Sequence, residues 1–280
     1  MRVALFPNIQ KRQSKSIAVG IKEFLHKEGV DVVVEDKEAD LIECEKLSSV
    51  KPDEIDFLIS FGGDGTILRI IHKYPELEAP ILGINLGSLG FLADIPVPEI
   101  YPSLQDLIRG EYKILDRMMI EGETIDGKKF SAVNDMVIHR AQNPSLVDLS
   151  IHVDGHYLNT FSADGIIVAT PCGSTAYSLA AGGPILEPGI PALVITPISA
   201  HTISNRPIVI RPEEDIQIQF LSEAMPVEVS NDGFSIHRLN TGEVFTIRYS
   251  ERTFRLVSLK SHDYFATLRT KLGWAGKMRA

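Results

Sequence analysis

The chain has 280 residues, 44% of them hydrophobic and 23% charged, which is ordinary for a globular protein of one large or two moderate domains. Its net charge of −9, without a long run of lysine or arginine, argues against nucleic acid as the main partner. Two distant cysteines, Cys44 and Cys172, indicate neither a disulfide framework nor a zinc site, and no apolar stretch approaches the ~18 residues of a membrane span. We therefore expect a cytoplasmic protein that does not bind a membrane.

The first hundred residues alternate between short apolar strands and amphipathic helices. Such alternation is typical of an α/β domain with a parallel, Rossmann-like sheet, in which ligands bind beyond the carboxyl ends of the strands. Strands are predicted at 3–6, 31–34, 57–61 and 81–84, and helices at 14–27, from Thr66 onward, and around 100–108.

A glycine-rich motif follows the third of these strands and is the most informative part of the sequence. It reads Gly62, Gly63, Asp64, Gly65 and Thr66. Glycines let backbone amides approach a ligand, and the free amides of a helix N-terminus favour phosphate. A carboxylate repels phosphate, so Asp64 would either hold Mg²⁺ or accept a proton from an attacking hydroxyl. The structural alternative is a strand-to-helix turn without a ligand.

From about residue 118 the pattern changes to short strands separated by turn dipeptides. Asp126-Gly127, Asp154-Gly155 and Asp232-Gly233 suit tight hairpins. We therefore expect a second, mainly β domain of the β-sandwich type, with the boundary near 95–100. A last helix is predicted at 264–274. The expected domains are 1–98 together with about 262–280, to which the last helix returns, and 99–261.

A second set of candidate ligand contacts lies in the β-rich half. Asp164 precedes a buried strand, which leads into the segment 170–184. Ser174 and Thr175 there are candidate caps of a short helix, and Tyr177 offers either a flat face for a base or a half-buried core ring. The pair Asn134-Asp135 suits the vicinal hydroxyls of a ribose, or else caps a turn.

Three weaker patterns are set aside. Residues 122–129 resemble a P-loop but end in Lys129 where a serine or threonine is needed, so we predict a hairpin turn. His152 and His156 flank a turn and are expected on hairpin strands, not in a zinc site. His201 is a candidate ligand contact, although a single histidine is more often structural.

Together these motifs resemble the NAD kinase family. The resemblance rests on 62–66, 85–92, Asn134-Asp135, Asp164-Gly165 and 170–184, in the same order over most of the chain. It implies transfer of the γ-phosphoryl group of ATP, or of polyphosphate, to the 2′-hydroxyl of the adenosine ribose of NAD, giving NADP. Mg²⁺ would arrive with the nucleotide, so no protein metal ligands are expected. The family also suggests a homodimer or homotetramer.

The same resemblance implies the residue roles. Asp64 would be the base that accepts the hydroxyl proton. Glycines 62, 63 and 65 and Thr66 would hold phosphates, the pair at 134–135 the ribose, and 175–177 the adenine. The full set of implied binding residues is Gly62, Gly63, Gly65, Thr66, Arg69, Phe91, Asn134, Asp135, Ser145, Ser162, Asp164, Cys172, Thr175, Ala176, Tyr177, Ser178, Leu179 and Ala180.

The chain departs from the family pattern at three positions, and two other functions compete. Asp135 replaces a frequent glutamate, Cys172 replaces a threonine or serine, and Phe234 replaces a glutamine.

A lipid kinase would share the loop at 62–66 but not the segment 170–184, and would need a membrane-binding helix. A non-catalytic dinucleotide sensor predicts a disabled loop, whereas Asp64 is intact.

Overall fold

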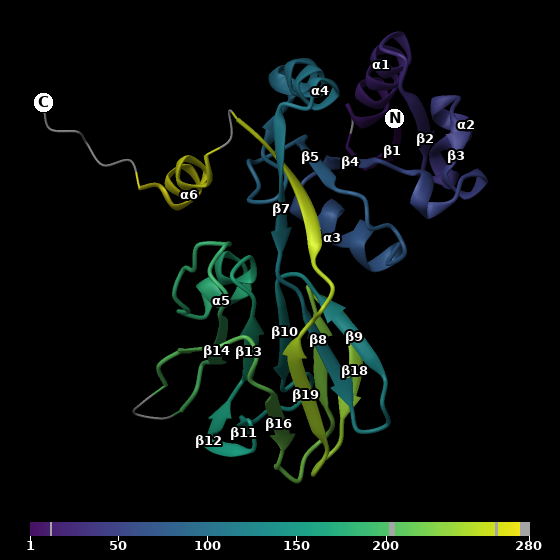
Figure 1. The fold of residues 1–280 in the computed structure, drawn as a ribbon. Coiled ribbons are helices and arrows are strands. Elements are labelled where there is room, and N and C mark those ends of the chain that lie inside the picture. Colours follow the sequence, from purple (N-terminus) through teal and green to yellow (C-terminus); the bar gives the residue numbers. More distant parts are fainter. Residues whose placement is uncertain (12, 202–204, 261–262, 275–280) are drawn as a thin grey trace, which may run out of the picture. The chain divides into compact units, whose positions relative to one another are not determined.

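The computed structural model describes residues 1–11, 13–201, 205–260 and 263–274. The chain forms two compact units, Met1–Asp116 with Arg255–Ala280, and Arg117–Phe254 (Figure 1). These limits differ from the expected ones at 98/99 and 261/262, and part of the expected segment 262–280 lies outside the described residues. The difference arises from the apolar core of the first unit, in which Leu104 and Leu107 pack in the same cluster as Val257 and Leu259. Residues 99–116 and 255–261 therefore belong to the first unit.

The first unit contains a mainly parallel sheet in the order β3-β2-β1-β4-β5-β20-β7, with β6 paired to β5. Its strands are β1 (Arg2–Pro7), β2 (Asp31–Val34), β3 (Glu45–Lys46), β4 (Phe57–Gly62), β5 (Ile81–Asn85), β6 (Ile95–Pro96), β7 (Tyr112–Arg117) and β20 (Phe254–Leu259). The helices are α1 (Ser14–Lys27), α2 (Ala39–Ile42), α3 (Asp64–Lys73), α4 (Ile100–Arg109) and α6 (Tyr264–Leu272). Short 3₁₀ turns lie at η1 (Asp36–Glu38), η2 (Leu47–Ser49), η3 (Pro52–Glu54) and η4 (Val97–Glu99).

The periodicity of the sequence explains most of these elements. The predicted helix at 14–27 is confirmed as α1, whose buried stripe of Ala18, Ile21 and Leu25 recurs at helical spacing. Strand β4 is buried along its whole length, as expected for a parallel strand covered on both faces. One boundary is wrong: α3 begins at Asp64, not at Thr66, because Gly63 already serves as the N-cap residue.

The second unit consists of two antiparallel sheets that share one apolar core, which confirms the predicted β-rich domain. The strand orders are β15-β14-β13-β10-β17-β18 and β12-β11-β16-β19-β8-β9. The strands are β8 (Ile120–Thr124), β9 (Lys129–Ala132), β10 (Asp135–His139), β11 (Val147–Val153), β12 (His156–Ala163), β13 (Gly165–Ala169), β14 (Leu193–Ile198), β15 (Ile208–Ile210), β16 (Ile216–Phe220), β17 (Val227–Asn231), β18 (Phe234–Leu239) and β19 (Val244–Tyr249). A 3₁₀ turn, η5 (Gly173–Thr175), and a one-turn helix, α5 (Tyr177–Ala180), follow β13.

The three turn dipeptides lie in hairpins as predicted. Gly127, Gly155 and Gly233 all have positive φ, and the two-residue loops at 154–155 and 232–233 also place their aspartates at positive φ. The stretch that resembles a P-loop is the β8–β9 hairpin. No helix in the described ranges is long and apolar enough to cross a membrane.

Candidate active site

The glycine loop of the first unit joins β4 to α3. Gly62 is the last residue of β4, and a Cβ atom there would lie 2.2 Å from Oγ1 of Thr66. Thr66 is buried, and its amide donates to the carbonyl of Gly63 over 2.9 Å. Only glycine at position 62 therefore lets the threonine pack beneath the loop.

The carboxylate of Asp64 is held by three backbone amides. Oδ1 accepts from Leu92 (3.0 Å) and Ala93 (2.9 Å), and Oδ2 accepts from Phe91 (2.9 Å). Because each carboxylate oxygen can accept about two hydrogen bonds, Oδ1 is filled by these amides and Oδ2 has one acceptor position left. The side chain is thus fixed in direction with one lone pair available.

The loop that supplies those amides, residues 86–93, is itself fixed by two residues. Buried Asn85 accepts from the Gly87 amide (2.6 Å) and donates to the carbonyls of Ser88 (2.5 Å) and Ala93 (3.0 Å). A Cβ atom on Gly90 would lie 2.1 Å from Oδ1 of Asp64. The loop can close on the carboxylate only because position 90 carries no side chain.

A cavity of about 490 Å³ opens at the glycine loop. Three cationic side chains lie on its wall, and a wall of glycine amides and cations suits phosphate. Of the implied phosphate contacts, the structure brings the three glycines, Thr66 and Arg69 together here, whereas Asp64 and Phe91 do not border the cavity. The lining residues are Pro7, Asn8, Ile9, Gln10, Lys11, Lys37, Gly62, Gly63, Gly65, Thr66, Arg69, Asn85, Gly87 and Ser88.

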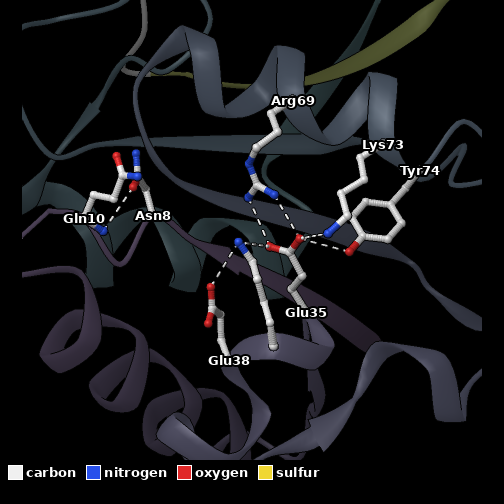
Figure 2. A network of polar contacts seen from close by, with 8 residues as sticks. Asn8, Gln10, Glu35, Glu38, Arg69, Lys73 and Tyr74 are labelled. Carbon is white, nitrogen blue, oxygen red and sulfur yellow. Dashed lines mark hydrogen bonds and ion pairs between the residues drawn. The ribbon is translucent and has the colours of Figure 1, made fainter.

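Arg69 has a partner that the sequence did not indicate, the fully buried Glu35 (Figure 2). The two side chains form two hydrogen bonds, of 2.9 and 3.1 Å, and Lys73 and Tyr74 also donate to Glu35. Burial alone would raise the pKa of Glu35, but the bonds from Arg69, Lys73 and Tyr74 and the charge of Arg69 outweigh it and lower the pKa to about 2. Glu35 is therefore an anion at neutral pH.

The second unit has a cavity of about 550 Å³ on the β10-β13-β17 side of its first sheet. Five residues predicted from the sequence meet there: Asn134, Asp135, Asp164, Ala176 and Tyr177. Tyr177 is 47% exposed and does not belong to the buried apolar core of this unit. The full lining is Asn134, Asp135, Val137, His139, Arg140, Ala141, Asp164, Ala176, Tyr177, Ile198, Ser230, Asp232 and Gly233.

Asp135 begins β10 and is almost completely buried. Burial, followed by the nearby charge of Asp232, raises the pKa of Asp135 from its ordinary value of 3.8 to about 7, although a hydrogen bond from the Tyr177 amide opposes this. Asp232 accepts from the amides of Val133 (2.9 Å), Asn134 (2.7 Å) and Asp135 (3.2 Å). The Asp232 carboxylate thus holds the backbone of Asn134 and Asp135, the two residues expected to bind the ribose.

Two residues of this cavity, Asp232 and Arg140, were not predicted from the sequence. Asp232 was assigned only to a hairpin, and it reaches residues 133–135 because β17 pairs with β10. Arg140 Nε lies 2.7 Å from Oδ1 of Asp164, so the two charges meet on the cavity wall. No local signal marks either residue, since each partner is far away in the sequence.

The segment 170–184 differs from expectation in its caps. Ser174 Oγ donates to Pro171 O (2.6 Å) and accepts from the Leu186 amide (2.9 Å), and Thr175 Oγ1 donates to Cys172 O (3.0 Å). Neither caps a helix, because the chain forms a 3₁₀ turn before α5 and these hydroxyls stabilise that turn. The predicted capping role is wrong.

The remaining implied residues lie outside the cavity lining. Ser178 Oγ is buried against Thr196 Oγ1 at 2.9 Å, and the Ser162 hydroxyl donates to the Asp148 carboxylate. Others simply do not border the cavity: Ser145, which is exposed in the β10–β11 loop, and Cys172, Thr175, Leu179 and Ala180.

The structure also places Phe234 and His201, two positions that the sequence singled out. Phe234 is exposed at the start of β18. The His201 amide donates to Ser162 O, whereas neighbouring Thr202 lies outside the described residues.

Comparison with known proteins assigns both halves of the chain. Residues 3–112 match the model of the ATP-NAD kinase N-terminal domain and residues 133–259 that of the ATP-NAD kinase C-terminal domain. The NAD kinase of Protochlamydia amoebophila is 59% identical, with 99% of each chain covered. The chain belongs to the NAD kinase family. The predicted resemblance is thereby confirmed, and the lipid kinase interpretation is dropped.

More distant members agree with this assignment. The NAD kinase of Geotalea daltonii is 39% identical over 98% of each chain. Among solved structures, yeast NADH kinase complexed with NADH has a TM-score of 0.88 and 28% identity, covering 100% of this chain and 89% of that one. An Archaeoglobus fulgidus NAD kinase in complex with ATP has a TM-score of 0.77 and 28% identity, covering 99% and 100%. As an NAD kinase family member, the chain is a phosphotransferase.

Proposed function

We propose that the protein transfers the γ-phosphoryl group of ATP to the 2′-hydroxyl of the adenosine ribose of NAD, giving NADP. Together with family membership, the observation that carries this proposal is the fixed carboxylate of Asp64, which follows a phosphate-type glycine loop and has one acceptor position left on Oδ2. Phosphoryl transfer depends mainly on positioning and charge neutralisation, with an aspartate that orients the attacking hydroxyl.

The cavity at the glycine loop is the proposed binding site for the phosphates of ATP. Lys11, Lys37 and Arg69 supply positive charge, and the glycines supply close approach to the backbone. Mg²⁺ enters with ATP as part of the substrate. No group of three or more His, Cys, Asp or Glu side chains placed to hold a metal ion occurs within the described ranges.

Asp64 is the proposed general base. Its Oδ2 accepts the proton of the acceptor hydroxyl while the three amides keep the side chain from turning away. Oδ1, which already accepts two bonds, is the less suitable atom. A positioned base of this kind typically contributes ~10²- to 10⁴-fold in rate.

The cavity of the second unit is the proposed dinucleotide site. Asn134 and ionised Asp135 bind the ribose hydroxyls, and Tyr177 with Ala176 contacts the adenine. The complex of yeast NADH kinase with NADH supports the proposal that this protein has a dinucleotide site. For Ser145, Ser162, Cys172, Thr175, Ser178, Leu179 and Ala180, a binding role stays a proposal that rests on the family pattern.

We also propose a cytoplasmic homodimer or homotetramer. Strand β15 is an edge strand, and its Ile208 and Val209 are exposed, so the second unit offers an apolar edge to another copy. Light scattering of the purified protein measures the oligomeric state directly, and a monomer at working concentration contradicts this part of the proposal.

One assay tests the proposed reaction. Purified protein is incubated with Mg²⁺, ATP and either NAD or NADH, and NADP or NADPH is measured. Formation of NADP that depends on both ATP and Mg²⁺ supports the proposal. Absence of either product from folded protein contradicts it, and retention of dinucleotide binding in that case favours a non-catalytic sensor.

A further inference from the structure

Glu35 lies at the centre of a group of polar side chains that we call the Glu35 cluster, formed by Glu35, Lys37, Arg69, Lys73 and Tyr74. Figure 2 shows its carboxylate between Arg69 on one side and Lys73 with Tyr74 on the other. Lys73 Nζ is 2.6 Å from Oε1, the Tyr74 hydroxyl donates over 2.9 Å, and Lys37 Nζ is 3.8 Å from Oε2. The side chain of Glu35 is 0% exposed. These contacts offset the cost of burying the carboxylate.

The cluster lies between two cavities of the first unit. Arg69 and Lys37 border the cavity at the glycine loop. Lys73 and Tyr74 border a separate cavity of about 370 Å³, as does Glu35. Lys37 borders both cavities, so of the cations around Glu35 only Arg69 borders the phosphate cavity alone and only Lys73 borders the other cavity alone.

Helix α3 by itself would not hold Arg69 in this position. Arg69 and Lys73 are four residues apart on α3, where like charges repel. The bidentate contact from Glu35 cancels that repulsion and fixes the plane of the guanidinium group. NH1 and NH2 each give one N–H to Glu35, so each has a second N–H that the carboxylate does not take.

We infer that Glu35 is a positioning residue for the phosphoryl donor, which it serves by holding Arg69 in the orientation that binds the phosphates of ATP. The inference rests on the proposed function, because it takes the cavity at the glycine loop as the phosphate site. Glu35 itself does not contact ATP. Its loss therefore weakens donor binding through Arg69 and leaves the dinucleotide site of the other unit unaffected.

The test compares Glu35→Gln with Lys73→Met. Glu35→Gln removes all the ion pairs of this carboxylate, including that with Arg69, whereas Lys73→Met removes only one of them and Lys73 does not border the phosphate cavity. We expect Glu35→Gln to raise KM for ATP and the calorimetric Kd for ATP by roughly tenfold to a hundredfold, the cost of misplacing a binding group. Lys73→Met should change both constants by less than about threefold.

A double-mutant cycle separates positioning from general stabilisation. In an Arg69→Met background, Glu35→Gln should have little further effect on the Kd for ATP, because the group it orients is already gone. Arg69→Lys keeps the positive charge but loses the planar guanidinium group with its two parallel N–H donors, so it should also weaken ATP binding. This variant leaves the buried carboxylate in place and tests the inference even when Glu35→Gln does not fold.

Three results would overturn the inference: an unchanged Kd for ATP in folded Glu35→Gln, an unchanged Kd in Arg69→Lys, or full additivity of Glu35→Gln and Arg69→Met. ATP calorimetry without NAD is independent of turnover. If the variants weaken ATP binding as predicted but the wild-type protein forms no NADP, the proposed reaction alone is contradicted. If the wild-type protein forms NADP but the Kd for ATP is unchanged in the variants, the positioning role alone is contradicted.

Discussion

At the scale of single residues, the structure gives Asp64 a definite geometry. A carboxylate at the end of a glycine loop could turn toward solvent, toward a metal ion or toward a hydroxyl. Three amides from residues 91–93 restrict it, and they leave Oδ2 as the oxygen with an available lone pair. The sequence is compatible with both a metal and a proton role for Asp64, and in either role Oδ2 is the oxygen available to the ligand.

We predict that Asp64→Asn folds and binds NAD but loses turnover by ~10²- to 10⁴-fold, because an amide cannot take up the hydroxyl proton. The measurement is kcat from NADP formation, with NAD affinity from calorimetry as the control. Turnover equal to that of the wild type would show that Asp64 is not the base.

Asp135 predicts a pH dependence of dinucleotide binding. Its pKa is raised to about 7 by burial and by the charge of Asp232. In the proposed dinucleotide site the ionised form would accept hydrogen bonds from ribose hydroxyls, so KM for NAD should fall as pH rises through about 7. Asp135→Asn should remove this dependence. A wild-type KM for NAD that is flat across this range would contradict the assignment.

The raised pKa of Asp135 also affects folding stability: a higher pH favours the proposed binding of NAD but lowers the free energy of unfolding. Because the pKa of Asp135 is higher in the folded than in the unfolded state, the folded protein binds more protons between about pH 4 and about pH 7. This contribution to the free energy of unfolding is fully present below about pH 4 and is lost as pH rises through about 7. Denaturant titrations of wild type and Asp135→Asn measure it.

At the scale of elements, the loop 86–93 is the part on which the proposed chemistry depends most. Asn85 fixes it at its base, and α6 contacts it from the C-terminal end of the chain. Lys271 Nζ donates to Leu89 O over 2.8 Å and lies 5.2 Å from the centre of the Phe91 ring. A helix near the end of the sequence thus helps to hold the loop whose amides orient Asp64.

We predict that Gly90→Ala lowers kcat by roughly a hundredfold, since a Cβ at this position would meet Oδ1 of Asp64 and displace the carboxylate. KM for ATP should change much less, because Gly90 does not border the phosphate cavity. Thermal unfolding serves as the control for folding. A kcat equal to that of the wild type would mean that the contact between loop and carboxylate is not needed for turnover.

At the scale of the whole molecule, an acidic protein concentrates positive charge at one site. The net charge is −9, yet Lys11, Lys37 and Arg69 border the same cavity. In the proposed phosphate site, ATP would be attracted by a local positive potential although the protein as a whole is negatively charged. Such attraction depends on partly exposed side chains and is sensitive to salt.

We predict that KM for ATP rises by roughly threefold to tenfold between about 0.05 M and about 0.5 M KCl, as the screening length shortens. The value of kcat should change less, because the hydrogen bonds that hold Asp64 are short-range. Steady-state kinetics at fixed Mg²⁺ measures both constants. A KM for ATP that is independent of salt would argue against these cations as the donor site.

Local sequence patterns determined the elements and the family of this protein. Helix α1, the strands around the glycine loop and the three hairpins follow from periodicity and turn residues, because those signals lie within a few residues of each other. The motif residues at 62–66, 134–135 and 170–184 likewise sufficed to indicate an NAD kinase.

Only the tertiary structure decided which partners hold those residues. Asp64 meets amides 27 to 29 residues away, Arg69 meets Glu35 at a separation of 34, and Asp232 meets amides 97 to 99 residues away. These pairs depend on which strands are neighbours, and strand order is set by the burial of whole apolar faces rather than by local propensity. The sequence alone therefore pointed to Asp64 as the proposed base, and the fold determined how its carboxylate is held.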